Sequence, residues 1–103
     1  MEDITFHHYT QRPAAGNKHV AIVGVVASGN LEVLAERVLS NDQFKIEIRT
    51  AAEGFESVWS AVVADFVERY PTGGLKFSIN DGGARPDTVM LRMAQAVRVM
   101  EEG

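Results

Sequence analysis

The most constraining feature of the sequence is a strand pattern, a helix pattern and a second strand pattern that follow one another. Residues 44–50 alternate apolar and polar or charged side chains without a break, and residues 75–80 alternate again. Residues 55–70 between them place apolar side chains at helical spacing. A strand, a helix and a strand in this order predict two parallel strands joined by a right-handed crossover.

Three further segments complete the predicted secondary structure. Residues 19–27 are almost entirely apolar and rich in β-branched side chains, which predicts a central strand buried on both faces. Residues 31–38 alternate and predict a half-buried strand, and Gly29 and Asn30 between the two segments favour a tight hairpin. Residues 86–101 begin with proline and carry an apolar stripe, which predicts a final helix.

The predicted order of elements is therefore β-β-β-α-β-α, an α+β fold. Short turns join the first three strands, so these strands are expected to be antiparallel. A mixed four-stranded sheet with two helices packed on one face would bury every apolar stripe. Residues 1–18 end in a polar, turn-forming stretch and are expected to form a flexible leader, which leaves residues 19–103 as a single domain.

Composition excludes several classes of function. The chain has no cysteine, which rules out disulfides, thiolate zinc sites and a cysteine nucleophile. A net charge of −4 with scattered basic residues argues against nucleic acid as a partner. No segment approaches the ~20 apolar residues of a membrane span, and the first residues lack the pattern of a signal peptide. We therefore expect no membrane partner and a cytoplasmic location.

The histidines and exposed carboxylates do not predict a metal site or acid–base chemistry. His7 and His8 are adjacent in the expected leader, and His19 opens a strand, with no carboxylate at ligand spacing on a shared element. Three glutamates occupy water-facing strand positions without a convincing partner for proton transfer. These are Glu32, Glu36 and Glu47.

The segment 81–86, Asp-Gly-Gly-Ala-Arg-Pro, lies between a predicted strand and a predicted helix. A turn with helix capping is the favoured interpretation, because the pattern is neither GxGxxG nor a P-loop. Arg85 leaves open a role in docking an anionic group. Three aromatic side chains of the preceding helix are predicted to belong to the core: Trp59, Phe66 and Tyr70.

Ser28 lies in the predicted hairpin turn with Gly29 and Asn30. From the residues alone, an ordinary turn serine is the favoured interpretation. No G-x-S-x-G pattern or suitably placed histidine activates it, so no catalytic residue is predicted. The small neighbours Ala27 and Gly29 leave the serine open to the active site of another enzyme, and a serine modified by a partner needs access rather than activation.

Residues 25–34, Val-Val-Ala-Ser-Gly-Asn-Leu-Glu-Val-Leu, resemble the attachment segment of the malonate decarboxylase delta subunit family of acyl-carrier proteins. The usual form in that family is Gly-Ser-Gly-Asp-Leu-Glu-Val-Leu, so Ala27 and Asn30 are departures. The resemblance covers roughly residues 17–100. It includes an Asp-x-Gly-Ala-x-Pro-like element at residues 80–86 and, in the helices, an aromatic position and a Val-x-Leu-Arg pattern: Trp59, Val89, Leu91 and Arg92.

The resemblance implies that Ser28 carries phosphoribosyl-dephospho-CoA through a phosphodiester bond, on a turn formed with Gly29 and Asn30. The arm ends in a thiol that holds acetyl or malonyl as a thioester. The implied partners are the acyltransferase and decarboxylase subunits of malonate decarboxylase and the phosphoribosyl-dephospho-CoA transferase that installs the arm. Asn30 lacks the negative charge that the usual aspartate places beside the attachment point. We expect this difference to affect recognition by that transferase.

Two other interpretations remain open from the sequence, and a third fails for want of a catalytic base. A citrate lyase-type carrier bears the same type of prosthetic group but has a different attachment segment. A small interaction module would explain the lack of a catalytic constellation. An independent hydrolase using Ser28 would need a base that the sequence does not supply.

Overall fold

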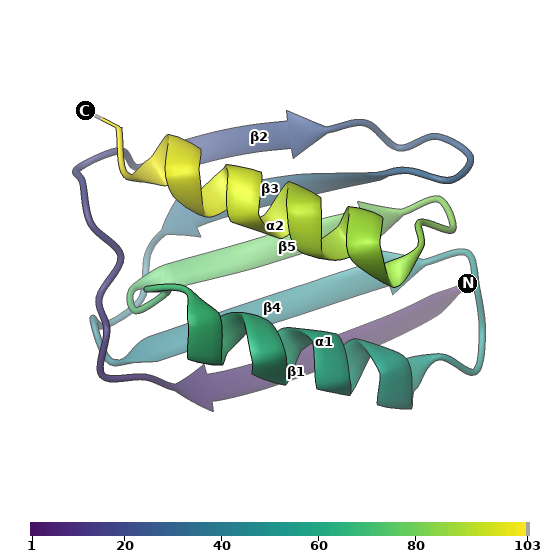
Figure 1. Cartoon of the computed structure of the whole chain (residues 1–103), viewed down its shortest axis with the longest axis horizontal. Coiled ribbons are helices and arrows are strands. Elements are labelled where there is room, and N and C mark those ends of the chain that lie inside the picture. Colours follow the sequence, from purple (N-terminus) through teal and green to yellow (C-terminus); the bar gives the residue numbers. More distant parts are fainter. Residues whose placement is uncertain (103) are drawn as a thin grey trace.

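The computed structural model describes residues 1–102, and its strands and helices follow the order β1-β2-β3-β4-α1-β5-α2 (Figure 1). The strands are β1 (Glu2–Tyr9), β2 (Val20–Gly24), β3 (Leu31–Arg37), β4 (Gln43–Thr50) and β5 (Leu75–Asp81). The helices are α1 (Glu56–Arg69) and α2 (Pro86–Met100). Gly103, the last residue of the predicted domain, lies outside the described residues.

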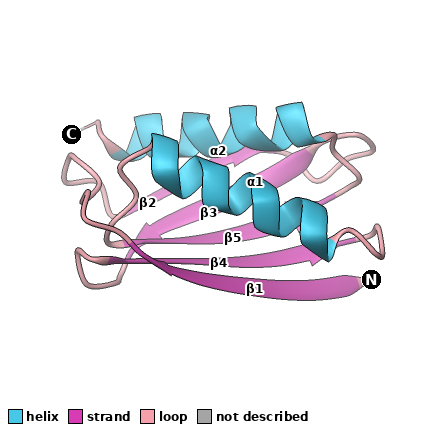
Figure 2. Cartoon of the chain, turned by 60° about the horizontal axis from the view of Figure 1, so that its bottom comes forward, coloured by secondary structure: helices cyan, strands magenta, loops and turns pink. Residues whose placement is uncertain are grey.

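The strands form a single mixed sheet in the order β1-β4-β5-β3-β2, and both helices cover the same face of it (Figure 2). The predicted α+β class and the arrangement of the helices are confirmed. The predicted parallel pair is also confirmed, because β4 and β5 lie side by side in parallel register. Every other pairing in the sheet is antiparallel. The sheet has five strands rather than the predicted four.

The fifth strand comes from the segment expected to be a flexible leader, and that expectation is wrong for residues 2–9. These residues form β1, which pairs antiparallel with β4 along its whole length. Ile4 is buried under α1 and Phe6 is half-buried. The period-two spacing of Ile4 and Phe6 is the sequence pattern that indicates this strand, but flanking charged residues and two adjacent histidines obscure the alternation.

Residues 10–18 also belong to the fold, because they cross the ends of both helices. Arg12 donates hydrogen bonds from its guanidinium to the carbonyl oxygens of Val67 and Glu68 at the end of α1. Gly16 lies so close to the end of α2 that an added Cβ would be 2.5 Å from the Glu101 carbonyl oxygen. Arg12 thus supplies partners for carbonyl groups that the end of α1 leaves unpaired, and Gly16 allows the chain to pass close to the end of α2.

Arg37, at the end of β3, holds this crossing segment in place. Its guanidinium donates to the carbonyl oxygens of Ala14, Ala15 and Lys18 at 2.9 Å each. A fourth bond of 3.0 Å reaches the carbonyl oxygen of Met100 at the last turn of α2. A cation at a helix C-terminus also interacts favourably with the helix dipole. One side chain therefore joins β3, the crossing segment and α2.

Two details of the predicted sheet differ from the structure. β2 was expected to be a central strand but is an edge strand, and its outward-facing Val20 and Ile22 are 52% and 65% exposed. A wholly apolar strand gives no alternation from which its exposed face can be predicted. β3 and β4 do run antiparallel, but β5 lies between them.

The core lies between the helices and the inner face of the sheet. Phe44, Phe66 and Phe77 form its aromatic centre, with ring centroids 5.1–6.3 Å apart. Phe66 is fully buried and Trp59 is 6% exposed, which confirms both as core residues. Tyr70 is half-buried and stacks on Phe66 at 4.8 Å. Neither described helix is long and apolar enough to cross a membrane.

The contribution of β1 can be tested by comparing neighbouring side chains on its two faces. We expect Ile4→Ala to lower the free energy of unfolding by about 2–4 kcal/mol, because it removes buried methylene groups beneath α1. Thr5→Ala changes an exposed residue of the same strand and should have little effect. Urea unfolding measures both, and equal, negligible effects would show that β1 does not stabilise the domain.

Candidate functional site

Ser28 lies at the tip of the β2–β3 hairpin, in a turn formed by residues 27–30. The Asn30 N–H donates to the Ala27 carbonyl oxygen at 3.0 Å and closes the turn. Gly29 has a φ of +73°, the conformation that the third residue of a type II turn requires. No atom lies within 4 Å of the position that a Gly29 Cβ would occupy. Ser28 is exposed, and the turn faces open space.

Gly82, in the loop between β5 and α2, supports the Ser28 turn through backbone contacts. The Gly29 N–H donates to the Gly82 carbonyl oxygen at 3.3 Å, and the Gly82 N–H donates to the Asn30 carbonyl oxygen at 2.9 Å. A Cβ on Gly82 would lie 2.1 Å from the Ala27 carbonyl oxygen. Only glycine permits this approach of two backbones. The two segments that carry the sequence resemblance therefore meet at Ser28.

Asn30 connects the turn to α2 through its side chain. Its Oδ1 accepts hydrogen bonds from the Leu31 N–H at 2.8 Å and from Arg92 Nε at 3.2 Å. An aspartate, the usual residue of the resembling segment, would offer an oxygen in the same place with a charge opposite Arg92. Asn30 preserves this hydrogen-bond geometry without the ion pair. The departure therefore changes the charge beside Ser28 rather than the shape of the turn.

Asp81 shapes the loop that supports the turn. Its carboxylate is buried and accepts hydrogen bonds from the Thr50 hydroxyl at 2.8 Å and from the Ala84 N–H at 2.9 Å. These bonds satisfy both carboxylate oxygens and join the ends of β4 and β5. The structure shows this segment as a turn before α2, but neither Asp81 nor the exposed Arg85 supplies a side-chain cap to the helix.

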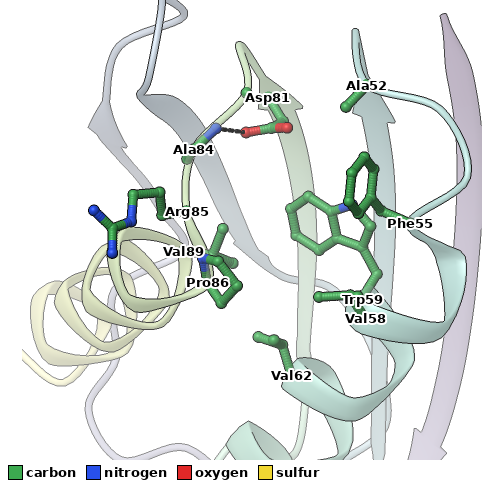
Figure 3. A pocket seen from close by; sticks show the side chains of 11 residues that line it. Ala52, Phe55, Val58, Trp59, Val62, Asp81, Ala84, Arg85, Pro86 and Val89 are labelled. Carbon is green, nitrogen blue, oxygen red and sulfur yellow. Dashed lines mark hydrogen bonds between the residues drawn. The ribbon is translucent and has the colours of Figure 1, made fainter.

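An apolar groove of about 350 Å³ lies between α1 and α2, beside this loop (Figure 3). We call it the α1–α2 groove. Phe55, Val58, Trp59 and Val62 line it from the α1 side, and Pro86 and Val89 line it from α2. Gly83, Ala84 and Arg85 form its border on the side of the Gly82 loop. The β2–β3 turn, the loop after β5 and the start of both helices lie at the same end of the sheet (Figure 1), so the Ser28 turn and the groove, which this loop borders, share that end.

Among residues 1–102, the structure places no histidine beside Ser28. The Ser28 hydroxyl forms no hydrogen bond with any other residue in the described range 1–102. His7 and His8 lie on β1, at the opposite edge of the sheet from β2, which is about 19 Å away at ordinary strand spacing. His19 precedes β2, at the opposite end of that strand from Ser28. The serine therefore has no base to activate it.

Two carboxylates of the open sheet face, Glu47 and Glu32, interact with neighbouring side chains. Glu47 accepts a bond of 2.9 Å from the Lys76 ammonium. This hydrogen bond and the positive charge of Lys76 lower the pKa of Glu47, which makes Glu47 a weaker base. Asn80 donates to Glu32 at 3.5 Å. Among residues 1–102, no three His, Asp or Glu side chains gather in a group that could hold a metal ion.

Comparison with known proteins identifies the family of this chain. The model of the malonate decarboxylase delta subunit family matches residues 18–100. The chain belongs to that family. A malonate decarboxylase acyl carrier protein of Bradyrhizobium diazoefficiens is 65% identical to it over 102 residues, which cover 99% of this chain and 97% of the relative. A protein of the same name from Xanthomonas euvesicatoria is 48% identical over 101 residues, covering 98% and 96%.

A solved structure supports the same family. A chain in the crystal structure of a Pseudomonas malonate decarboxylase hetero-tetramer in complex with malonate superposes with a TM-score of 0.85. It is 31% identical in sequence, and the superposition covers 97% of this chain and 99% of that chain. The resemblance inferred from residues 25–34 and 80–86 is thereby confirmed at the level of the family.

Two features of the site were missed by sequence reasoning. Gly82 had been assigned to a turn, but its contacts with Ala27 and Asn30 could not be inferred without the pairing of β3 with β5. The α1–α2 groove was missed because Phe55, Val58 and Trp59 have the spacing of a core-facing stripe. The exposure of Phe55 and Val58 depends on how far apart the two helices lie.

The support of the Ser28 turn by Gly82 can be tested with a single methyl group. We expect Gly82→Ala to displace residues 27–30 and to lower stability by ~2 kcal/mol, because the added Cβ collides with the Ala27 carbonyl oxygen. The amide NMR shifts of residues 27–30 should change. Gly54→Ala is the control for a Gly→Ala change elsewhere: it strains a positive φ, which Gly82 does not have, but its Cβ meets no atom within 4 Å, so it should leave the shifts of residues 27–30 unchanged. Unchanged shifts in Gly82→Ala would contradict this support.

Proposed function

We propose that this chain is the acyl-carrier subunit of a malonate decarboxylase, with a phosphoribosyl-dephospho-CoA arm attached to the Ser28 hydroxyl through a phosphodiester bond. The observation that carries the proposal is an exposed, unpaired serine on a rigidly supported turn. The family to which the chain belongs supports it. In this role the chain holds acetyl and malonyl groups as thioesters and performs no bond-making step itself.

The residues around Ser28 fit a group that another enzyme installs. Ser28 is exposed, Gly29 leaves open space above the turn, and no neighbouring side chain competes for the hydroxyl. Attachment would form a bond between the Ser28 oxygen and a phosphorus of the donor, with the hydroxyl proton passing to a base and the bond from that phosphorus to the donor's leaving group breaking. The modifying enzyme must therefore supply both the base and the activated donor. Gly29 and Asn30 keep the serine presented, and the Asn30 side chain is in turn held by a hydrogen bond from Arg92.

When bound, the arm would supply a thioester, which acts as the electron sink for decarboxylation of malonyl. What this chain contributes is a fixed attachment point. Besides the bonds of the strand pairing, six backbone and side-chain hydrogen bonds hold residues 25–31 together or join them to Gly82 and Arg92. The turn is therefore expected to move little. The long arm then provides the motion between active sites and keeps the acyl group at high local concentration.

The proposal includes partners and a location. The acyltransferase subunit would exchange acetyl for malonyl, and the decarboxylase subunits would release CO₂ from malonyl. The phosphoribosyl-dephospho-CoA transferase would attach the arm. The similar chain in the Pseudomonas hetero-tetramer supports an assembly with decarboxylase subunits. We place this assembly in the cytoplasm.

Intact-mass spectrometry tests the attachment. We expect the chain, co-expressed with its modifying enzymes, to gain the mass of one phosphoribosyl-dephospho-CoA group. Ser28→Ala should abolish the gain, because the acceptor oxygen is lost. Ser40→Ala is the matched control, since Ser40 is also an exposed serine in a turn between strands, and this variant should be modified normally.

Two results would overturn the proposal. One is an unmodified mass for the wild-type chain in the presence of active modifying enzymes. The other is a modification that persists in Ser28→Ala. A variant that is unmodified because it is unfolded is recognised from its circular dichroism spectrum. Because Ser28 lies outside the core, the Ser28→Ala spectrum should match that of wild type.

A further inference from the structure

We infer that the α1–α2 groove binds the acetyl thioester at the end of the arm on Ser28 and excludes the malonyl thioester. The inference rests on the proposed function, because it needs an arm attached to Ser28. It assigns to the groove a role that the attachment site alone does not have. The acetyl form would be sheltered from water between turnovers, and the malonyl form would stay free for decarboxylation.

The walls of the groove suit a small apolar group. Phe55 and Val58 remain 49% and 42% exposed, although apolar side chains gain free energy when they leave water. Trp59 forms a largely buried wall beside them (Figure 3). The volume of about 350 Å³ lies in the range of small-molecule sites, which are mostly apolar with few polar groups. An acetyl group with the adjoining part of the arm is of this size and character.

The polar groups at the border distinguish acetyl from malonyl. Arg85 borders the groove, but Figure 3 shows its side chain directed away from Trp59 and Phe55, and no other lining residue is a cation. Asp81 lines the groove, and both of its oxygens already accept hydrogen bonds. A malonyl carboxylate would enter an apolar space beside this carboxylate without a counter-charge, which is strongly unfavourable. Acetyl is neutral and meets no such cost.

The arm starts beside the groove. The Gly29 N–H bonds to the Gly82 carbonyl oxygen at 3.3 Å, and the next residues of that loop, Gly83 to Arg85, border the groove. Three residues span at most about 11 Å of chain. A flexible tether of suitable length gives an effective concentration in the millimolar range, so even a ~1 mM affinity would fill the groove about half of the time.

The experiment uses the full chain with the arm attached, loaded with either acetyl or malonyl. The rate of thioester cleavage by hydroxylamine reports shelter from solvent, and the emission of Trp59 reports occupation of the groove, because Trp59 is the sole tryptophan. Val58→Asp places a charge in the groove, and Leu91→Asp is the matched control on α2, exposed and outside it. Phe55→Ala removes a wall without adding charge.

We expect the acetyl thioester to react two- to tenfold faster in Val58→Asp and Phe55→Ala than in wild type, the range for 50–90% occupancy. Leu91→Asp should behave as wild type. Loading with acetyl should change the Trp59 emission and loading with malonyl should not, and the malonyl rate should be the same in all four chains.

Other results would overturn the inference in recognisable ways. Equal acetyl rates in wild type and both groove variants, on chains whose mass confirms the arm, would leave the carrier function intact and remove the role of the groove. Equal protection of malonyl would remove the discrimination. Loss of subunit association in Val58→Asp without a change in acetyl rate would make the groove a subunit contact. An arm absent from Ser28 would overturn the carrier function, and the inference would fall with it.

Discussion

The arrangement of this protein depends on the position of β5 between β4 and β3. The crossover through α1 makes β5 parallel to β4, and the other edge of β5 pairs with β3 in a register that sets Leu31 opposite Asp81. This register brings the β2–β3 turn beside the loop after β5. The close approach of Gly82 to Ala27 then follows, because no side chain separates the two backbones. The presentation of Ser28 is a consequence of strand register.

The same constraint brings the apolar groove close to Ser28, the proposed attachment point. The loop that supports the Ser28 turn continues into α2, and its residues Gly83 to Arg85 border the groove between the helices. Asp81 ties this loop to Thr50 at the end of β4, so the supports of the turn and of the groove are connected. In the proposed carrier function, these contacts give the arm a fixed base, and the motion comes from the arm itself.

The peripheral segments stabilise this arrangement from the far end of the sheet. Arg37 joins β3 to the crossing segment and to the last turn of α2, and Arg12 meets the end of α1. These contacts hold the helices on the sheet at the end away from Ser28. At the opposite ends of the helices, Phe55 and Val58 remain partly exposed beside the groove. The end of the molecule that carries the proposed attachment site is therefore the end with these exposed apolar side chains.

The sequence by itself determined the local elements and the family. Strict alternation in residues 44–50 and 75–80 and helical spacing in residues 55–70 were sufficient for the parallel unit, and the segment around Ser28 indicated the carrier family. The tertiary structure alone decided which strands are neighbours, that residues 2–9 form an edge strand, and that Gly82 supports the turn. Side-chain periodicity reports which face of an element is buried, whereas strand order and backbone approach depend on contacts between distant segments. The groove has the same origin, because its existence depends on the spacing of two helices rather than on the pattern within either one.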